Sequence, residues 1–230
     1  MKKTWLAATV FAAALAPSVH AIELTTEDQK LSYAFGLLMG DNLKANVENL
    51  DLDAFAAAVE DIYKGEDPLL TPEEVRAVYT AFEQKQRQAQ MAVVEQAARE
   101  AQERGKAYQE ENAKKEGVMV TESGLQYETL VEGTGPAPTA EDTVTVHYKG
   151  TLVNGNQFDS SYDRGEPTTF PLNGVIPGWT EGVQLMKVGG KTRFVIPAEL
   201  AYGVTGAGQA IGPNETLVFE VELVEINPAQ

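Results

Sequence analysis

Hydrophobic and polar positions follow a helical period through the first half of the chain. Residues 31–39 are apolar nearly all the way round a helix, and Thr26 with Gln29 forms a candidate capping box before them. A second helix is predicted from about residue 53 to 64, with apolar residues on one face and Gly65 as its C-terminal stop.

A third, much longer helix is predicted over residues 71–116. It begins with Thr71-Pro72-Glu73-Glu74, a cap followed by a proline in the first turn, and only Gly105 interrupts the strong helix formers that follow. Such a helix is about 68 Å long, which is wider than a globular core. Beyond Glu83 it is polar nearly all round, as expected of a helix that bridges domains through solvent.

The first two helices are too short to bury their apolar faces alone. We therefore predict an intertwined homodimer through residues 22–82, with a monomeric three-helix bundle as the alternative. Gly105 and Gly117 are candidate hinges between the arms.

The second half of the chain alternates with the period of strands. Alternation predicts strands at residues 125–131, 144–148, 191–197 and 217–223, and one short helix near 180–187. An antiparallel sheet with one apolar face needs a cover, and the short helix is the candidate. The fold class is therefore α+β: an all-α N-terminal part, then an antiparallel β-sheet wrapped around one short helix.

The residue composition supports this division. Residues 22–119 hold 5 of the 20 glycines, and residues 120–230 hold the other 15. We predict a helical dimerisation domain at 22–70, a connecting helix at 71–116 and a second domain at 120–230.

The N-terminal residues have the pattern of an export signal. Lys2 and Lys3 precede an apolar run at 5–15, and small residues lead to Ala21. We predict a cleavable signal peptide at 1–21. The alternative is a membrane anchor, but a span needs about 20 apolar residues. The expected location is the periplasm, with no integral membrane segment after cleavage. Association with the outer membrane, or secretion, stays open.

Charge and composition exclude several kinds of chemistry. The net charge is −16, which disfavours nucleic-acid binding. The chain has no Cys and two His, which removes thiol nucleophiles, iron–sulfur clusters and thiolate zinc sites. We expect no cofactor and no metal.

Five short motifs in the second half carry a family resemblance. In chain order they are Val146-His147-Tyr148-Lys149-Gly150, Asn154-Gly155 through Phe158-Asp159-Ser160-Ser161, Val175-Ile176-Pro177-Gly178-Trp179, Ala201-Tyr202-Gly203 and Leu217-Val218-Phe219. Over residues 120–226 the chain resembles the FKBP-type peptidyl-prolyl cis-trans isomerases. Its helical first half resembles the dimeric periplasmic subgroup that includes the macrophage infectivity potentiator proteins.

The resemblance implies a prolyl pocket and assigns its residues. The floor would be Trp179, and the substrate-binding walls would be Phe158, Val175, Ile176, Ile211 and Phe219. Asp159, Tyr202 and Tyr148 would be catalytic, with hydrogen bonds to substrate from Tyr202 and from the Ile176 amide.

Each assignment has a structural alternative. Trp179 and Phe219 could be ordinary core, and Tyr202 a solvated turn residue. Asp159 could be a structural carboxylate paired with Arg164, or could orient Tyr148 or Tyr202 rather than act directly. His147, opposite Tyr148, is predicted to be a surface residue, and Ser160 and Ser161 to be turn caps.

Departures from the family pattern bear on ligands. Thr168 stands where many members carry an aromatic residue, the connection at 171–174 is short, and Ala207 and Ala210 occupy a loop that often bears bulkier residues. The pocket is therefore expected to be more open on that side. Macrolide inhibitors are candidate ligands whose affinity these departures leave undecided.

Three functions remain for the whole chain. The first is an isomerase that accelerates folding of proline-containing, unfolded or partly folded exported proteins. The second is a holdase-type chaperone that uses the cleft of a V-shaped dimer. The third is a binding module with little or no turnover.

Overall fold

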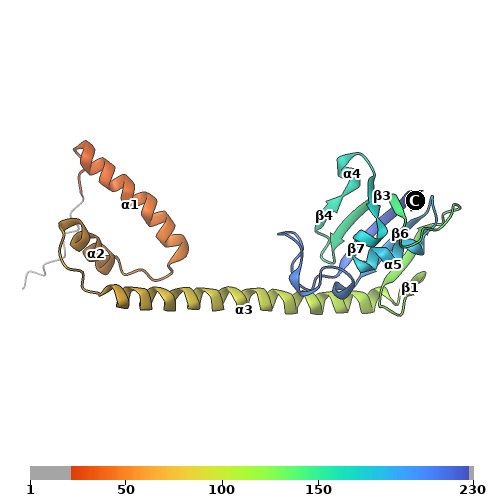
Figure 1. The fold of residues 1–230 in the computed structure, drawn as a ribbon, viewed down its shortest axis with the longest axis horizontal. Coiled ribbons are helices and arrows are strands. Elements are labelled where there is room, and N and C mark those ends of the chain that lie inside the picture. Colours follow the sequence, from red (N-terminus) through yellow and green to blue (C-terminus); the bar gives the residue numbers. More distant parts are fainter. Residues whose placement is uncertain (1–21, 228–230) are drawn as a thin grey trace, which may run out of the picture. The chain divides into compact units, whose positions relative to one another are not determined.

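The computed structural model describes residues 22–227, so the predicted signal peptide at 1–21 lies outside the described residues. The chain divides into two compact units, one ending at Val75 and one beginning at Arg76. The boundary falls near the start of the long helix, so most of that helix belongs with the strand-rich part of the chain (Figure 1).

The two short helices of the first unit form as predicted. Helix α1 spans Glu27–Asn46, and Thr26 and Gln29 make the predicted capping box. Helix α2 spans Leu52–Lys64 and ends at Gly65, whose φ of 73° is in the left-handed region that glycine adopts readily.

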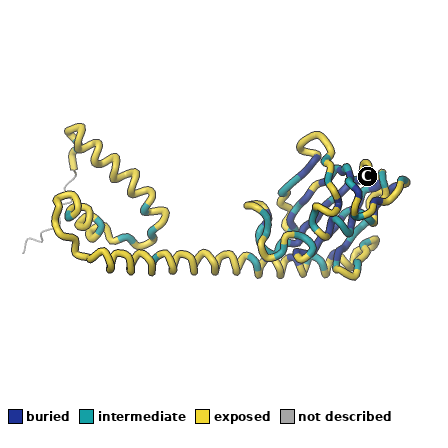
Figure 2. Tube along the Cα trace, in the orientation of Figure 1, coloured by how far each residue is buried: buried dark blue, intermediate teal, exposed yellow. Residues whose placement is uncertain are grey.

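These two helices have no core of their own within the described chain. No residue of α1 or α2 is buried, and Figure 2 shows both helices exposed along nearly their whole length. Leu38, for example, is 71% exposed.

Helix α3 spans Pro72–Asn112, four residues shorter at its end than predicted. Thr71 and Glu74 make the predicted capping box. The helix ends at Asn112 because the chain then tightens into turns with three-residue hydrogen bonds, including Lys115 N–H to the Asn112 carbonyl.

The C-terminal part of α3 packs on the sheet rather than crossing solvent. Ala101, Gly105 and Asn112 are buried, and Asn112 Nδ2 donates to Gln126 Oε1 at 2.9 Å. The prediction of a solvent-bridging helix is therefore wrong for this end, because tertiary contacts bury one side of a mostly polar segment.

Seven strands form one antiparallel sheet within the described residues, in the order β1-β2-β6-β7-β3-β4, with β5 also paired to β3. The bounds are Val118–Val120 for β1, Gln126–Val131 for β2, Thr143–Leu152 for β3, Gln157–Ser160 for β4, Thr168–Pro171 for β5, Lys191–Ile196 for β6 and Leu217–Asn227 for β7. The four predicted strands correspond to β2, β3, β6 and β7, and the α+β fold class is confirmed. Strands β1, β4 and β5 are too short to give a periodic signal.

The predicted alternation holds in the two longest strands. Val144, Val146 and Tyr148 of β3 are buried with alternate residues more exposed, and Leu217, Phe219, Val221 and Leu223 of β7 are buried likewise. In β2 an irregularity between Thr129 and Val131 shifts the register, and Val131 is exposed.

The short helix α5, Pro177–Gln184, covers the apolar face of the sheet. It lies three residues earlier than predicted, because Pro177 starts it and the chain turns at Leu185. Val183 and Met186 enter the core as expected. The sequence does not predict four short helical segments: α4 (Ser161–Arg164) and the 3₁₀ segments η1 (Leu172–Gly174), η2 (Ala198–Leu200) and η3 (Gly203–Thr205).

Within residues 22–227 no helix is both long enough and apolar enough to cross a membrane.

Candidate active site

A pocket of about 670 Å³ opens between α5, the sheet and the loop before β7. Its lining residues are Tyr148, Phe158, Asp159, Phe170, Gly174, Val175, Ile176, Trp179, Tyr202, Ala207, Ala210, Ile211 and Phe219. All nine residues predicted for the site are among them. The fold thus gathers residues from five separate motifs around one hollow.

Trp179 lies at the bottom of the pocket within a group of aromatic rings. Its ring meets those of Tyr148, Phe170 and Phe219 edge-on, at centroid distances of 5.3, 5.6 and 5.2 Å. Edge-to-face packing of this kind favours a fixed arrangement of the rings. Trp179 is 4% exposed and still lines the cavity, so its face is available only to a group that enters the pocket.

The indole N–H of Trp179 has no hydrogen-bond partner among the described residues. A buried donor without a partner costs about 1–3 kcal/mol. A residue selected only for core packing would avoid that cost, so the unpaired N–H favours a ligand-facing role for Trp179 over the core alternative.

One edge of the pocket is polar and fully paired. The Tyr148 hydroxyl donates to Asp159 Oδ2 at 2.5 Å, and Arg164 Nη1 donates to Asp159 Oδ1 at 2.6 Å. Arg164 Nη2 lies 2.9 Å from the Tyr148 oxygen and 3.0 Å from Thr168 Oγ1. Asp159 therefore pairs with Arg164 and also holds Tyr148.

This network sets the charge of its members. Burial alone would raise the pKa of Asp159, but hydrogen bonds from Tyr148 and Arg164 outweigh it, so the pKa lies below its usual value. Burial and the bond to Asp159 raise the pKa of Tyr148. At neutral pH the pocket edge therefore carries an ionised carboxylate beside a neutral phenol.

Two hydrogen-bond donors at the pocket are unused by the protein. The Tyr202 side chain is 41% exposed, and its hydroxyl bonds to none of residues 22–227. Ile176 caps α5 with its carbonyl, which accepts from Trp179 and Thr180, while its own N–H meets no acceptor in the described part of the chain. Both donors remain available to a ligand.

Residues missed as lining from the sequence come from short or irregular elements. Phe170 lies in the four-residue strand β5, and Gly174 in the turn that follows it. Ala207 and Ala210 line the pocket on the side where the sequence predicts a more open wall. The alternation of Thr168–Pro171 was the one local signal for Phe170, and it is too short to stand out.

His147 is half-buried rather than on the surface. Its Nδ1 lies 3.1 Å from Ser161 Oγ, and its ring stacks on Tyr162 at 4.8 Å. The buried Ser161 hydroxyl also accepts from the Tyr148 amide at 2.7 Å. The surface prediction failed because α4 folds over the outer side of β3. Ser160 caps α4 as predicted, accepting from the Asp163 amide.

Family models and relatives match most of this chain. Residues 135–224 match the model described as FKBP-type peptidyl-prolyl cis-trans isomerase, and residues 28–129 match the domain amino terminal to it. A probable FKBP-type isomerase FkpA of Neisseria meningitidis is 47% identical over 86% of this chain and 74% of its own. The outer membrane protein MIP of Legionella longbeachae is 38% identical over the whole of both chains.

A solved structure extends the match to three dimensions. The crystal structure of FkpA from Escherichia coli superposes with a TM-score of 0.78 at 42% identity, covering 90% of this chain and 99% of that one. With its aromatic pocket, two matching family models and relatives that align along nearly all of its length, this chain belongs to the FKBP-type peptidyl-prolyl cis-trans isomerases.

Proposed function

We propose that the pocket floored by Trp179 binds the proline of exported, unfolded or partly folded proteins and accelerates rotation of the bond that precedes it. The observation that carries this proposal is a hollow with a buried aromatic floor, a paired carboxylate at its edge and two unused donors at its rim.

Isomerisation of an X-Pro bond requires no nucleophile. Rotation about a peptide bond crosses a barrier of about 18–20 kcal/mol because the twisted amide loses resonance. A catalyst therefore needs to bind the twisted form more tightly than the planar one. An apolar cavity fits the proline ring and removes water from around the amide, which strengthens the remaining polar contacts.

The polar residues then have separate roles. Tyr202 Oη and the Ile176 amide donate to substrate carbonyls and fix the peptide's position. Asp159 faces the carbonyl of the rotating bond and keeps Tyr148 in place through their hydrogen bond. The proline ring packs on the indole of Trp179.

An isomerisation assay on the mature protein tests this proposal. We expect turnover of a short X-Pro peptide, a reduced rate for Asp159→Ala and Tyr202→Phe, and inhibition by a macrolide. Because Trp5 lies in the predicted signal peptide, Trp179 is the one tryptophan of the mature chain, and its fluorescence should change on macrolide binding. Equal rates in both variants would remove these residues from the mechanism.

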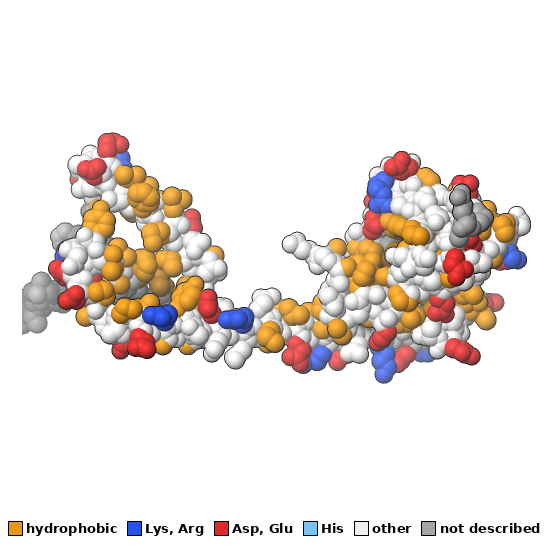
Figure 3. Space-filling view, viewed as in Figure 1, with side chains coloured by type: hydrophobic (Ala, Val, Ile, Leu, Met, Phe, Trp, Pro, Cys, Tyr) orange, Lys and Arg blue, Asp and Glu red, His pale blue; other side chains and the backbone are white. Residues whose placement is uncertain are grey.

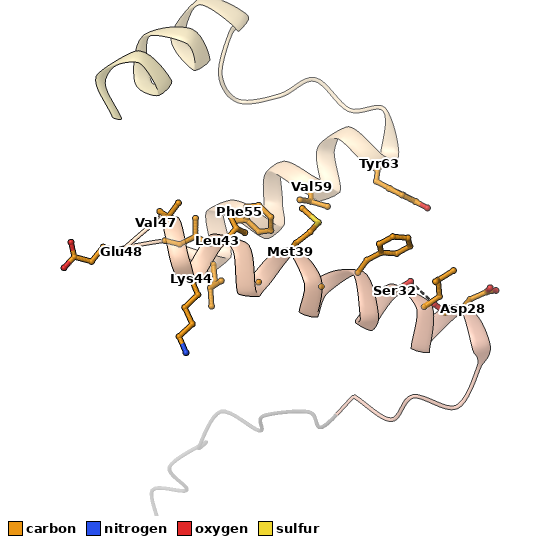
Figure 4. Close-up of a pocket in the computed structure, with 16 residues that line it drawn as sticks. Asp28, Ser32, Met39, Leu43, Lys44, Val47, Glu48, Phe55, Val59 and Tyr63 are labelled. Atoms are coloured by element: carbon orange, nitrogen blue, oxygen red, sulfur yellow. Dashed lines mark hydrogen bonds between the residues drawn. The ribbon is translucent and has the colours of Figure 1, made fainter. Parts of the chain in front are cut away.

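The exposed apolar faces of the N-terminal unit favour a second activity, binding of unfolded proteins. A groove of about 1090 Å³ lies between α1 and α2, and Figure 4 shows Met39, Leu43, Phe55 and Val59 between the two helices. Hydrophobic side chains also gather over this unit in Figure 3. We propose that residues 22–82 form a homodimer that covers these faces, and that the dimer binds unfolded clients as a chaperone in the periplasm.

The two activities are separable by experiment. The Tyr202→Phe protein should still suppress aggregation of a client whose folding is not limited by proline. If suppression falls in step with isomerisation, the separate chaperone activity is wrong. Fractionation of cells that express the full chain tests the periplasmic location, together with N-terminal sequencing for cleavage after Ala21.

A further inference from the structure

The segment that precedes β7 folds back on itself and forms one wall of the pocket. We call residues 202–216 the pocket hairpin. Ala207 and Ile211 exchange two backbone hydrogen bonds of 2.8 and 3.2 Å, and the Asn214 amide donates to the Gly203 carbonyl at 2.9 Å. Four residues of the hairpin line the pocket, namely Tyr202, Ala207, Ala210 and Ile211.

The base of the same hairpin rests on the long helix α3. The Thr216 hydroxyl accepts from Gln109 Nε2 at 2.9 Å, and the Glu215 carboxylate lies 3.3 Å from Arg104 Nη2. Thr216 is 2% exposed and the Glu215 side chain 10%. Figure 1 shows the blue loop before β7 descending to α3.

Only two positions of the pocket hairpin are buried, Ile211 in the pocket and Thr216 on α3. The residues between them are exposed or half-buried. A loop with so few buried contacts is held in place mainly where it is anchored. The contact of Thr216 with α3 is therefore one of the two buried anchors of this wall of the pocket.

Gly105 makes that contact close. A Cβ on Gly105 would lie 2.3 Å from Thr216 Oγ1 and 3.1 Å from Thr216 Cβ. Glycine destabilises a helix interior relative to alanine, so its presence in an unbroken helical turn calls for a reason. Close approach of the hairpin base supplies that reason, and α3 runs unbroken through Gly105.

We propose that Arg104, Gly105 and Gln109 of α3 are positioning residues for the prolyl site. They hold the base of the pocket hairpin, and the hairpin in turn places Ile211 and Ala207 in the pocket wall. The effect on catalysis rests on the proposed function of the pocket. The long helix is then part of the site's support as well as a connector, and a change at its surface alters substrate binding.

The test compares variants of the full mature chain. Gly105→Ala places a methyl group against Thr216, and Arg104→Ala removes the charge beside Glu215. The control is Arg99→Ala, because the hydrogen bonds of the Arg99 side chain go to Glu95 and Gln96 within α3 and not to the hairpin. The first readout is hydrogen exchange of the Ala207 and Ile211 amides, and the second is kcat and KM for a short X-Pro peptide.

We expect exchange at Ala207 and Ile211 to accelerate about three- to tenfold in Gly105→Ala, the range that loss of one hydrogen bond produces. KM should rise more than kcat falls, while exchange of the β6 amides stays unchanged. Gln109→Ala removes the donor to the Thr216 hydroxyl without adding bulk, so it should accelerate exchange of the same two amides in the same direction as Gly105→Ala.

Exchange rates and KM equal to those of Arg99→Ala would overturn the proposal. Faster exchange spread over the whole sheet would also overturn it, since that indicates general destabilisation. If the wild-type chain shows no turnover, the proposed function fails, and the exchange measurement still decides whether α3 anchors the hairpin.

Discussion

The Tyr148 hydroxyl donates to Asp159 Oδ2 over 2.5 Å, and Arg164 binds both residues. Tyr148 comes from β3 and Asp159 from β4, so pairing of these strands brings the two together at the pocket edge. The guanidinium also lies over the Tyr148 ring, at 5.5 Å from its centroid. The carboxylate thus fixes the orientation of the Tyr148 phenol at the pocket edge.

Removal of the Tyr148 hydroxyl should show whether its hydrogen bond to Asp159 matters for activity apart from the packing of the Tyr148 ring. Tyr148→Phe keeps the ring among its aromatic neighbours and takes away the bond to Asp159, so we expect kcat/KM for an X-Pro peptide to fall about tenfold. The control is Tyr162→Phe, because Tyr162 binds Glu222 on the outer side of the sheet. Loss of activity in both variants to the same extent would contradict the role of Tyr148.

The lowered pKa of Asp159 makes a prediction about stability and pH. A folded pKa below the unfolded value, about 3.9, means that the native state binds fewer protons than the unfolded state. The stabilising contribution is therefore complete above the unfolded pKa and is lost as pH falls through the folded one. Urea unfolding should show a constant advantage of wild type over Asp159→Asn between about pH 5 and 7, shrinking below about pH 4.

Asp163→Asn is the matched control for that series, because Asp163 accepts from Gln157 and does not touch the pocket network. An advantage over Asp159→Asn that persists unchanged at pH 2 would show that ionisation of Asp159 is not its source.

Replacing the floor of the pocket should affect binding beyond its effect on stability. Trp179→Ala removes the indole and should lower the free energy of unfolding by about 3–5 kcal/mol while abolishing macrolide binding. Met186→Ala, in the core near the end of α5, should lower it by about 2–5 kcal/mol and leave binding intact. Calorimetric titration of both folded proteins checks this. Macrolide binding that survives in Trp179→Ala would show that Trp179 is a core residue and not a ligand-binding one.

Gly150 is a position where the sheet leaves no room for a side chain. A Cβ there would lie 2.6 Å from the Phe158 ring and 2.7 Å from the Phe219 ring. Gly150→Ala should therefore displace two pocket walls and lower kcat/KM about tenfold or more. Gly182→Ala, whose Cβ meets the core residue Phe194 at 2.7 Å, should lower the melting temperature with a smaller change in the kcat/KM of the folded protein.

The exposed faces of α1 and α2 predict the state of assembly. A glutamate at Leu38 places a charge in any interface that covers this face, so Leu38→Glu should convert a dimer to a monomer. Met91→Glu is the control, because Met91 is equally exposed on α3 but lies outside residues 22–82. Analytical ultracentrifugation distinguishes the two. A wild-type chain that sediments as a monomer would remove the dimer proposal altogether.

Local signals along the sequence were sufficient for much of the fold. The Thr26 and Thr71 caps, the Gly65 stop and the alternation in β3 and β7 each act within a few residues, so their patterns predicted the elements that the structure contains. The five motifs likewise contained eight of the nine predicted site residues, all but Ile211, because family resemblance preserves the order and spacing of residues that meet in space.

Contacts between distant residues decided the rest. The short strands β4 and β5 form because β3 offers them hydrogen-bond partners, and α5 is placed by a proline and by the core it covers. Arg104 contacts Glu215, which is 111 residues away in the sequence, and Gln109 contacts Thr216, which is 107 residues away. A local pattern shows which face of a segment avoids water. It does not show which distant segment packs against that face, because the pairing of segments is decided by the packed tertiary structure.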